Sequence, residues 1–322
     1  MLDKNEFIRK TPMIKINYKY KGKENKIFAK LEYFNMTGSI KDRVAFYIIN
    51  NAKKRGELKE GMSIVEATSG NTGIALAALG GYYKHPVYIF MPDWVSKERI
   101  ELMKSYGAKV FLISKEEGGF KKCVSKAKKM AKEINGLLTN QFSNKDNFLA
   151  HYETTGEEII NQIPEKIGGF VSGVGTGGTL MGIGERLKEE FKDILITAIE
   201  PDKMPIISTG KMISQHKIEG IGDDFIPKIV DRKLIDEIIL INDEDAINMS
   251  RKIAKELGIG VGISSGANMI ASVLAKANNK KEIVTVFADD NKKYLSTDLN
   301  KSLDNNKDFI SNKIDLLEYE FI

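Results

Sequence analysis

The amino-acid sequence predicts an α/β fold built on a mostly parallel sheet. Two observations carry this prediction. Short runs rich in β-branched residues look like buried strands, and the longer stretches between them repeat apolar residues every three or four positions, as surface helices do. Strands and helices that alternate in this way are typical of parallel sheets covered by helices.

The individual elements can be placed in chain order. We expect strands at residues 27–29, 63–65, 87–90, 110–113, 170–171, 194–196 and 283–287. We expect helices at residues 41–54, 71–83, 96–106, 120–134, 178–191 and 245–257. After a polar stretch at 300–313, the apolar tail around Leu316 and Leu317 is predicted to form a peripheral helix.

Length and charge limit the classes of protein. The chain has 322 residues, 42% hydrophobic and 29% charged, which suits one large domain or two closely joined ones. Lys and Arg (49) barely outnumber Asp and Glu (44), and no basic run is flanked by stacking aromatics, so nucleic acid is not an expected partner. No apolar stretch approaches the roughly 18 to 20 residues of a membrane span, and no apolar signal core follows the charged start. We therefore expect a cytoplasmic protein without membrane contact.

The cysteine and histidine content argues against a metal or disulfide framework. Cys123 is the single cysteine, so it cannot form an intrachain disulfide. The three histidines, His85, His151 and His216, lie far apart and show no metal-ligand spacing. No metal site is predicted.

The turn at 172–179 is expected to bind a phosphate. It follows a predicted strand, precedes a predicted helix, and is rich in glycine, so backbone N–H groups and the helix dipole can face an anion while two threonines add hydroxyl donors. The residues expected to take part are Gly175, Thr176, Gly177, Gly178 and Thr179. A tight turn without a ligand is the simpler alternative.

The same turn also matches the dinucleotide pattern Gly-x-Gly-x-x-Gly, from Gly173 to Gly178. Glu200 ends the next predicted strand, where an acid would bind ribose in such a fold. A nicotinamide-dependent dehydrogenase is therefore a remote alternative. It would leave the two turns described next without a role.

The turn at 66–73 suits a carboxylate. Hydroxyl groups of Thr68, Ser69 and Thr72 and the N–H groups of a helix start can form an anion-binding loop, although this loop contains no fixed positive charge. A plain helix cap is the alternative, but one Ser or Thr would suffice for that.

The turn at 35–43 places Lys41 at the start of a helix, where the helix dipole disfavours a cation and lowers the pKa of an amine. Alone, a solvated lysine paired with Asp42 would be the better interpretation. Beside a phosphate loop and a carboxylate loop, Lys41 instead points to pyridoxal phosphate (PLP), which a lysine holds as a Schiff base. In the segment 260–268, the hydroxyl of Ser264 could meet the pyridine nitrogen of PLP, or it could simply cap a helix.

These motifs, taken together, resemble the cysteine synthase and cystathionine β-synthase family. The resemblance runs through most of the chain, from Lys10-Thr11-Pro12 to Lys293-Tyr294-Leu295-Ser296-Thr297. It implies the fold-type II of PLP enzymes, which is like tryptophan synthase β and has two parallel-sheet α/β domains with the cofactor between them. It also implies a homodimer, with a larger domain (1–40 and 148–322) that binds the PLP phosphate and a smaller, mobile domain (41–147) that binds the substrate carboxylate.

The resemblance further implies residue roles. Lys41 carries the cofactor, Asn71 bonds the pyridoxal 3′-oxygen, residues 175–179 take the phosphate and Ser264 faces the ring nitrogen. The substrate is expected to contact Thr68, Ser69, Asn71, Thr72, Gln141 and Gly220.

The implied reaction is β-replacement on a small amino acid by a sulfur or oxygen nucleophile. After the amino acid displaces Lys41 from the cofactor, the freed amine removes the Cα proton, the β-substituent leaves an aminoacrylate, and the nucleophile adds at Cβ. In a cysteine synthase, O-acetylserine and sulfide give cysteine and acetate.

Two stretches depart from the cysteine synthase pattern. Asp223 and Asp224 stand where small residues are typical, and a carboxylate there suits a donor or nucleophile that needs acid or base help. The alternative is therefore a donor such as cysteine or serine, with release of hydrogen sulfide or water, as in a cysteine lyase or a lanthionine or cystathionine synthase. A solvated pair of loop acids is the simpler explanation. The stretch 288–294 also lacks the usual glycine, so specificity is expected to differ there.

Overall fold

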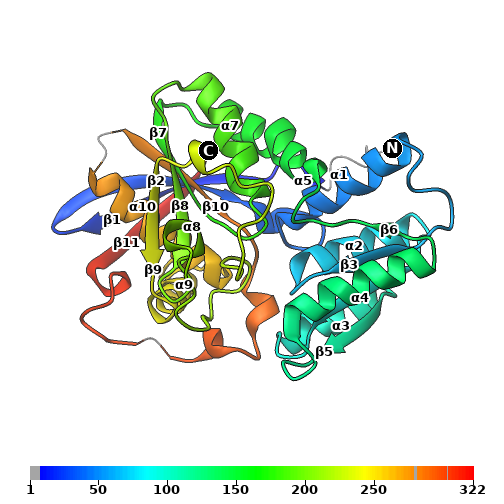
Figure 1. The fold of residues 1–322 in the computed structure, drawn as a ribbon. Coiled ribbons are helices and arrows are strands. Elements are labelled where there is room, and N and C mark those ends of the chain that lie inside the picture. Colours follow the sequence, from blue (N-terminus) through cyan, green and yellow to red (C-terminus); the bar gives the residue numbers. More distant parts are fainter. Residues whose placement is uncertain (1–7, 279–280, 303) are drawn as a thin grey trace.

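The computed structural model describes residues 8–278, 281–302 and 304–322, and it is an α/β structure with two separate sheets (Figure 1). In this part of the chain the larger sheet has seven strands, in the order β11 (Ile314–Phe321), β1 (Met13–Tyr20), β2 (Lys23–Leu31), β10 (Glu282–Phe287), β7 (Ile167–Gly173), β8 (Leu195–Pro201) and β9 (Glu237–Ile241). The smaller sheet has four, in the order β5 (Lys109–Ile113), β4 (Val87–Pro92), β3 (Ile64–Ala67) and β6 (Leu137–Leu138).

Helices connect the strands and cover the sheets. The longer ones are α1 (Lys41–Lys54), α2 (Asn71–Tyr82), α3 (Lys97–Ser105), α4 (Gly119–Glu133), α7 (Gly178–Glu190), α9 (Asp243–Leu257) and α10 (Ile263–Asn278). The shorter ones are η2 (Glu32–Phe34), α5 (Lys145–Ala150), the π-helix η3 (His151–Gly156), α6 (Glu157–Gln162), α8 (Ile206–Thr209), η4 (Arg232–Leu234), η5 (Asn291–Tyr294), η6 (Asp298–Asn300) and η7 (Ser311–Lys313).

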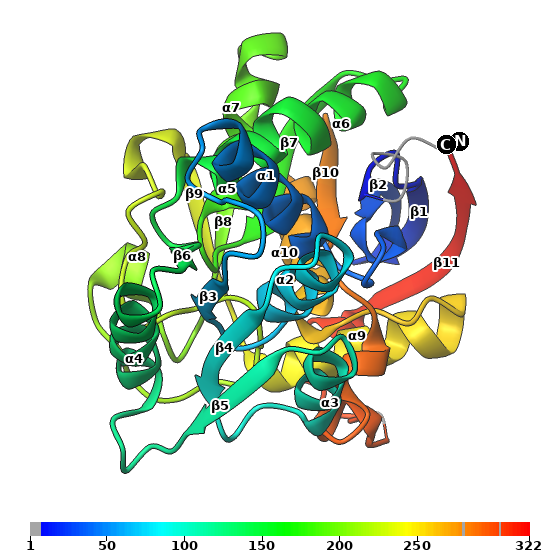
Figure 2. The same ribbon diagram turned by 90° about the vertical axis from the view of Figure 1, so that its right-hand side faces the viewer.

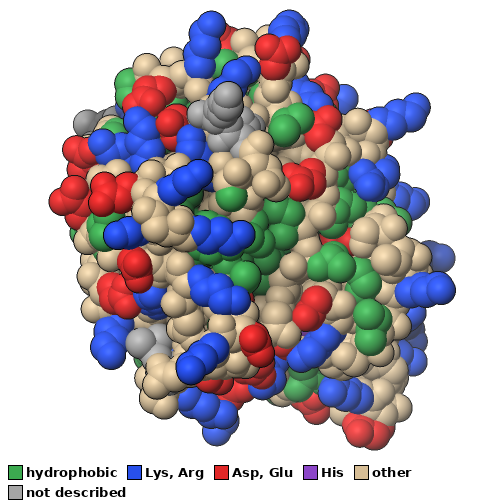
Figure 3. Space-filling model, turned by 90° about the vertical axis from the view of Figure 1, so that its left-hand side faces the viewer, with side chains coloured by type: hydrophobic (Ala, Val, Ile, Leu, Met, Phe, Trp, Pro, Cys, Tyr) green, Lys and Arg blue, Asp and Glu red, His purple; other side chains and the backbone are tan. Residues whose placement is uncertain are grey.

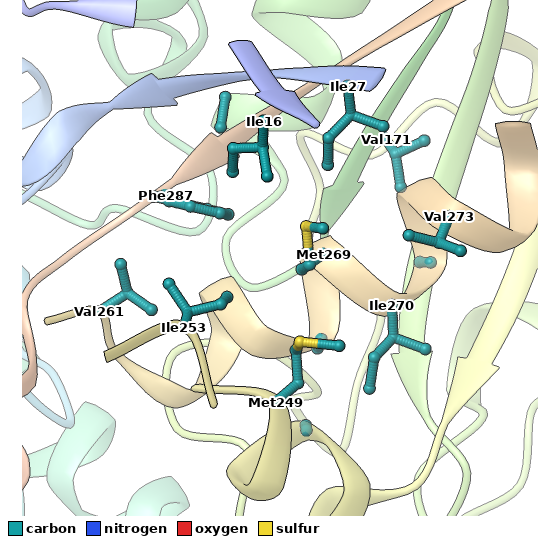
Figure 4. Close-up of a cluster of buried hydrophobic side chains, with 14 of the residues drawn as sticks. Ile16, Ile27, Val171, Met249, Ile253, Val261, Met269, Ile270, Val273 and Phe287 are labelled. Carbon is teal, nitrogen blue, oxygen red and sulfur yellow. The ribbon is translucent and has the colours of Figure 1, made fainter. Parts of the chain in front are cut away.

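The larger sheet is parallel from β2 through β10 and β7 to β9, and it is antiparallel at the β2, β1 and β11 edge. Its two faces are covered by different helices. Helices α9 and α10 pack on one face, where Ile16, Met249, Met269 and Phe287 belong to a single buried cluster (Figure 4). Helices α6 and α7 pack on the other face.

The smaller sheet is entirely parallel. Apolar residues of α1, α2 and α3 pack on one of its faces, and Cys123, Ala127 and Ala131 of α4 pack on the other. Each sheet therefore has its own two-sided core, and the carboxyl ends of the parallel strands remain available for a site.

Local sequence signals explain individual helices, and α9 is an example. The side chain of Asn242 accepts hydrogen bonds from the N–H groups of Glu244 and Asp245, and three acidic residues occupy the first turn. Gly258 ends the helix in a left-handed conformation, which glycine adopts at little cost. These residues form a helix because both ends of the backbone are satisfied.

The predicted fold class is confirmed. Every predicted strand overlaps an observed one, and each of the six helices predicted between residues 41 and 257 matches an observed helix to within two residues at either end. Strands β1, β6, β9 and β11 were not predicted, and β1 and β11 make one edge of the larger sheet antiparallel.

The predicted C-terminal helix is wrong, because residues 314–321 form strand β11. Ile314 and Leu316 are buried while Asp315 and Leu317 are exposed, which is the two-residue alternation of a strand. Pairing with β1 satisfies the backbone of both segments, and Figure 2 shows the red strand β11 running beside the blue strands. The sequence of the tail alone does not indicate its partner strand, because β1 lies at the opposite end of the chain.

The surface is mixed in charge. In Figure 3, basic and acidic side chains are interspersed over one face, around a hydrophobic patch near its centre. Among the described residues, no helix is both long and apolar enough to cross a bilayer.

A pair of substitutions in β11 tests its orientation. Ile314→Ala should lower the free energy of unfolding by about 2–5 kcal/mol, because it leaves a cavity against β1. Leu317→Ala, three residues along the same strand but 47% exposed, should change it by about 0.5 kcal/mol or less. Urea denaturation measures both variants, and equal losses would contradict the strand.

Candidate active site

A cavity of about 490 Å³ lies where loops from the two sheets meet. Its walls include residues that follow the carboxyl ends of β3, β4, β7 and β10, the position at which open α/β sheets bind ligands. Predicted site residues on its walls are Lys41, Thr68, Ser69, Asn71, Thr72, Gln141, Gly175, Thr176, Gly177, Thr179, Gly220, Asp223 and Ser264. Gly178 and Asp224 are not among the residues that line it.

Lys41 stands at the first position of α1 and reaches the cavity. Burial lowers the pKa of its amine to about 8, while the carboxylates of Asp223 and Asp289 oppose that shift. Asp42 does not pair with Lys41. Its carboxylate accepts hydrogen bonds from the N–H and hydroxyl of Thr37, at 2.9 and 2.6 Å, and so closes the turn before α1. The interpretation of Lys41 as a solvated partner of Asp42 is therefore wrong.

The glycine-rich turn after β7 is held in place by the side chain of Asn147, which lies outside the turn. The amide of Asn147 donates to the Thr176 hydroxyl at 2.8 Å and to the Gln141 carbonyl oxygen at 2.9 Å. A Cβ at Gly178 would lie 2.0 Å from the Asn147 amide oxygen, so glycine is needed for this close approach. The Thr179 hydroxyl lies 3.3 Å from the Nε2 atom of the buried His151. Loop and helix start are thus fixed before any ligand binds.

The loop after β3 is organised around Gln141. The Thr72 hydroxyl donates to its side-chain oxygen at 2.6 Å, and its side-chain nitrogen donates to the Ala67 carbonyl at 3.2 Å. Beneath them, the Glu66 carboxylate accepts from the backbone N–H groups of Gln141 and Ala67. Burial raises the pKa of Glu66 to about 7 despite these bonds. The fold thus brings Thr72 and Gln141 together at the cavity wall.

Asn71 is oriented by the stretch 288–294, which departs from the cysteine synthase pattern. Its side-chain nitrogen donates to Asp289 at 2.8 Å, and Asp289 also accepts from the Tyr294 hydroxyl at 2.7 Å. The buried side-chain oxygen of Asn71 has no hydrogen-bond partner within the described chain. That oxygen is left for a ligand in the cavity.

The two neighbouring acids face different surroundings. Asp223 is half-buried on the cavity wall, and burial together with Asp224 raises its pKa to about 6, against the effect of Lys41. Asp224 is exposed and forms a 3.1 Å ion pair with Lys121 of α4. Only Asp223 is placed to act inside the cavity.

The remaining predicted residues occupy helix ends. Ser264 lies in the first turn of α10 and lines the cavity. Glu200, the acid of the dinucleotide alternative, accepts hydrogen bonds from the backbone N–H groups of Ile207 and Ser208 and so supports α8. Its carboxylate therefore already has a structural role. No cluster of metal-binding side chains occurs among the described residues.

Sequence reasoning missed several residues of this site. Asn147, Asp289 and Arg99 each contact a predicted loop, but they lie far from it in sequence. The altered stretch at 288–294 was noticed, yet nothing in it indicated Asn71 as the partner. Arg99 lies within a predicted helix and Asn147 lies outside every predicted one, and neither position carried a motif that indicated a role.

Comparisons with known proteins agree with this geometry. A family model described as "Pyridoxal-phosphate dependent enzyme" matches residues 4–289. A probable cysteine synthase of Bacillus subtilis is 42% identical over 300 residues, covering 91% of this chain and 96% of the relative. The solved structure of a hydrogen sulfide-producing enzyme from Fusobacterium nucleatum is 48% identical with a TM-score of 0.94, covering 99% of this chain and 98% of that one. A cysteine synthase of Entamoeba histolytica is 40% identical with a TM-score of 0.88, covering 97% and 94%.

The chain therefore belongs to the family of pyridoxal-phosphate dependent enzymes, with the fold-type II architecture. Its relatives further identify it as a PLP-dependent β-replacement enzyme of the cysteine synthase type. The cavity fits this cofactor. It offers the Lys41 amine, hydroxyl donors beside the start of α7, and the unpartnered amide oxygen of Asn71.

Asn147 provides a test of how the glycine-rich turn at 172–179 is supported. Asn147→Ala should lower the free energy of unfolding by about 1–3 kcal/mol, because the Gln141 carbonyl oxygen loses its buried donor. PLP affinity should also fall, since the Thr176 hydroxyl is no longer fixed. Urea denaturation and PLP titration measure the two effects. The exposed Asn161→Ala on α6 is the control, and an Asn147 variant as stable as that control would contradict the role.

Proposed function

We propose that this enzyme accepts cysteine as a donor and releases sulfide, in addition to the cysteine synthase type of reaction that its family performs. The observation that carries the proposal is Asp223, a carboxylate on the cavity wall whose pKa is raised to about 6. The similarity to a hydrogen sulfide-producing enzyme supports it. The overall change is cysteine plus water to serine plus hydrogen sulfide.

PLP held at Lys41 would, once the substrate amino group takes the place of the lysine, withdraw electrons from Cα and so ease the loss of the Cα proton and of the β-substituent. Lys41 itself would move that proton. Its pKa of about 8 leaves a useful fraction of the freed amine neutral near pH 7, as a general base requires. The same nitrogen would return the proton to Cα at the end of the reaction.

The loop after β3 would orient the amino acid. The hydroxyls of Thr68, Ser69 and Thr72 lie at the start of α2, where N–H groups without helical partners favour an anion. Gln141 fixes the Thr72 hydroxyl at 2.6 Å. A carboxylate bound there leaves the Cα and Cβ atoms to face the rest of the cavity. We assign Asn71, residues 175–179, Gly220 and Ser264 to cofactor or substrate contacts on the same basis.

Asp223 would assist the addition of water at Cβ. When O-acetylserine is the donor, acetate leaves without help, whereas an attacking water must lose a proton as its oxygen bonds to Cβ. The ionised Asp223 would accept that proton, and sulfide leaves as hydrogen sulfide by taking up one proton overall. The exposed Asp224, paired with Lys121, lies outside the cavity and has no part in this step.

The cysteine synthase reaction with O-acetylserine and sulfide is supported by the identity to cysteine synthases, so the proposal concerns whether cysteine is a donor as well. Separate assays with O-acetylserine, serine and cysteine distinguish the two. Sulfide release in the assay that contains cysteine as its only amino acid supports the proposal. Absence of that release, with full activity on O-acetylserine, would leave only the cysteine synthase reaction.

The proposal also covers the division of the chain into two domains and its assembly into a homodimer. Residues 41–147, which carry the smaller sheet, would move as a unit against residues 1–40 and 148–322 when substrate binds. The separate cores of the two sheets support this division. A cytoplasmic homodimer rests on the family resemblance alone, and light scattering with the purified protein tests the dimer.

Lys41→Ala should abolish turnover with every donor, because the Lys41 amine would both carry the cofactor and move the Cα proton. Steady-state rates of cysteine and sulfide formation measure the loss. Lys54→Ala, at the exposed far end of the same helix, should keep normal rates. Near-normal multiple turnover by Lys41→Ala would refute the assignment.

Asp223→Asn should slow sulfide release from cysteine by roughly 100-fold or more, as expected for loss of a general base. The rate with O-acetylserine should change little. In the unmodified enzyme the cysteine reaction should weaken as the pH falls below about 6, because Asp223 becomes protonated. This acidic limb should disappear in the variant.

Asp224→Asn is the matched control for Asp223→Asn, since it removes the neighbouring charge outside the cavity. It should leave the rates with both donors near normal. An Asp223→Asn enzyme with unchanged rates on every donor would end the proposed role of this carboxylate.

A further inference from the structure

Arg99 of α3 is a buried cation beside the carboxylate loop, and sequence reasoning assigned it no role. Its side chain is only 2% exposed, yet it forms part of the cavity lining. A Cβ built at Gly70 would lie 2.5 Å from Nε and 2.6 Å from Cδ of Arg99. The arginine stem therefore packs directly against the backbone between Ser69 and Asn71.

The guanidinium has several neighbours around the cavity. It forms an ion pair with Glu219, lies 4.0 Å from Asp289, stacks 4.5 Å from the centre of the Tyr294 ring, and approaches the Ser96 hydroxyl at 3.5 Å. Its buried Nε has no hydrogen-bond partner in the described chain. Since arginine stays protonated in proteins, a full positive charge resides here.

A positive charge beside the neighbouring loop would stabilise a substrate carboxylate bound there. The loop itself offers hydroxyl and backbone donors but no cation, and a carboxylate that leaves water for a half-enclosed cavity loses much of its hydration. Lys41 also lines the cavity, but in the proposed function its nitrogen is engaged with the cofactor and with the Cα proton. Arg99 is the buried cation in contact with the loop backbone.

We infer that Arg99 supplies the fixed positive charge for the substrate carboxylate, and that Glu219 competes with the substrate for this charge. The inference rests on the proposed assignment of the loop from Thr68 to Thr72 as the carboxylate site. Arg99 is then a binding and specificity residue, selecting amino acids with a free carboxylate over neutral analogues.

Glu219 is well placed to compete. It belongs to the loop that also carries Gly220 and Asp223, it lines the cavity, and its carboxylate forms an ion pair with Arg99. Its side chain is 29% exposed, which lets it turn toward water when another anion arrives. Asp289, by contrast, is already bound by Asn71 and Tyr294 and would stay in place.

The test uses the PLP-loaded full chain and two ligands without a leaving group at Cβ, L-alanine and L-alaninamide. Equilibrium binding is followed through the absorbance of the cofactor, so no turnover is needed. Arg99→Gln should weaken L-alanine roughly tenfold or more, as expected for loss of about 1.4 kcal/mol of charge interaction. The affinity for L-alaninamide should change by less than about twofold. Arg99→Lys should weaken the binding of L-alanine by less than Arg99→Gln does.

Glu219→Gln should act in the opposite direction. Removing the competing anion should tighten L-alanine several-fold and leave L-alaninamide unchanged. This variant keeps the inference testable if Arg99→Gln fails to fold, which thermal unfolding would reveal. Weaker L-alanine binding by Glu219→Gln, or equal effects of Arg99→Gln on the two ligands, would overturn the inference and leave Arg99 a structural residue.

Thr72→Val distinguishes this inference from the proposed carboxylate site on which it rests. If the loop binds the carboxylate, Thr72→Val should weaken L-alanine more than L-alaninamide. If it affects neither ligand, the carboxylate site itself is misplaced. If it weakens L-alanine while Arg99→Gln does not, the loop is correct and the role of Arg99 is wrong.

Discussion

The position of Lys41 depends on a buried charge network around Arg43, two residues further along α1. The Arg43 guanidinium is 1% exposed and donates to both oxygens of Glu32, at 2.7 and 2.8 Å, and to both oxygens of Glu158, at 2.7 and 2.8 Å. Glu32 lies just after β2 and Glu158 lies in α6. One side chain therefore links the start of α1 to the carboxyl end of β2, inside the larger sheet, and to helix α6.

Such a network is costly to disrupt. Lys30, fully buried, completes it by pairing with Glu158 at 2.9 Å. Despite burial, these two cations hold the pKa of Glu158 at about 2, well below its usual range. Removing one partner of a buried pair leaves an uncompensated charge, at a cost of about 3–5 kcal/mol. The first turn of α1 is thus held rigidly while the side chain of Lys41 projects into the cavity.

The turns could be identified from sequence because their chemistry is local. Gly175 to Thr179 and Thr68 to Thr72 each place donors within a few residues of a helix start, and short spacing is visible in a single chain. What the sequence does not reveal is the set of residues that support those turns. Asn147 reaches Thr176 across 29 positions and Asp289 reaches Asn71 across 218, and such pairings are made only by the fold. Strand β11 escaped prediction for the same reason, because its partner β1 lies at the other end of the chain.

The loop at residues 216–224 contains several acids, and one side chain, His216, determines which of them face the cavity. The His216 ring lies 2.8 Å from the Gly222 carbonyl oxygen through Nε2, while Nδ1 accepts from the N–H of Ile218 at 3.2 Å. Burial lowers the pKa of His216, which keeps the ring neutral and lets one nitrogen donate while the other accepts.

This closed loop turns both Glu219 and Asp223 toward the cavity and leaves Asp224 facing α4. The same brace therefore places one carboxylate beside Arg99 and another where its charge is felt at Lys41. Sequence alone favoured Asp223 over Asp224 but could not separate either acid from a solvated loop pair, because adjacent loop residues carry no periodicity that distinguishes inside from outside. The loop that His216 braces at Gly222 and Ile218 makes that separation, so one carboxylate lines the cavity while its neighbour pairs with α4.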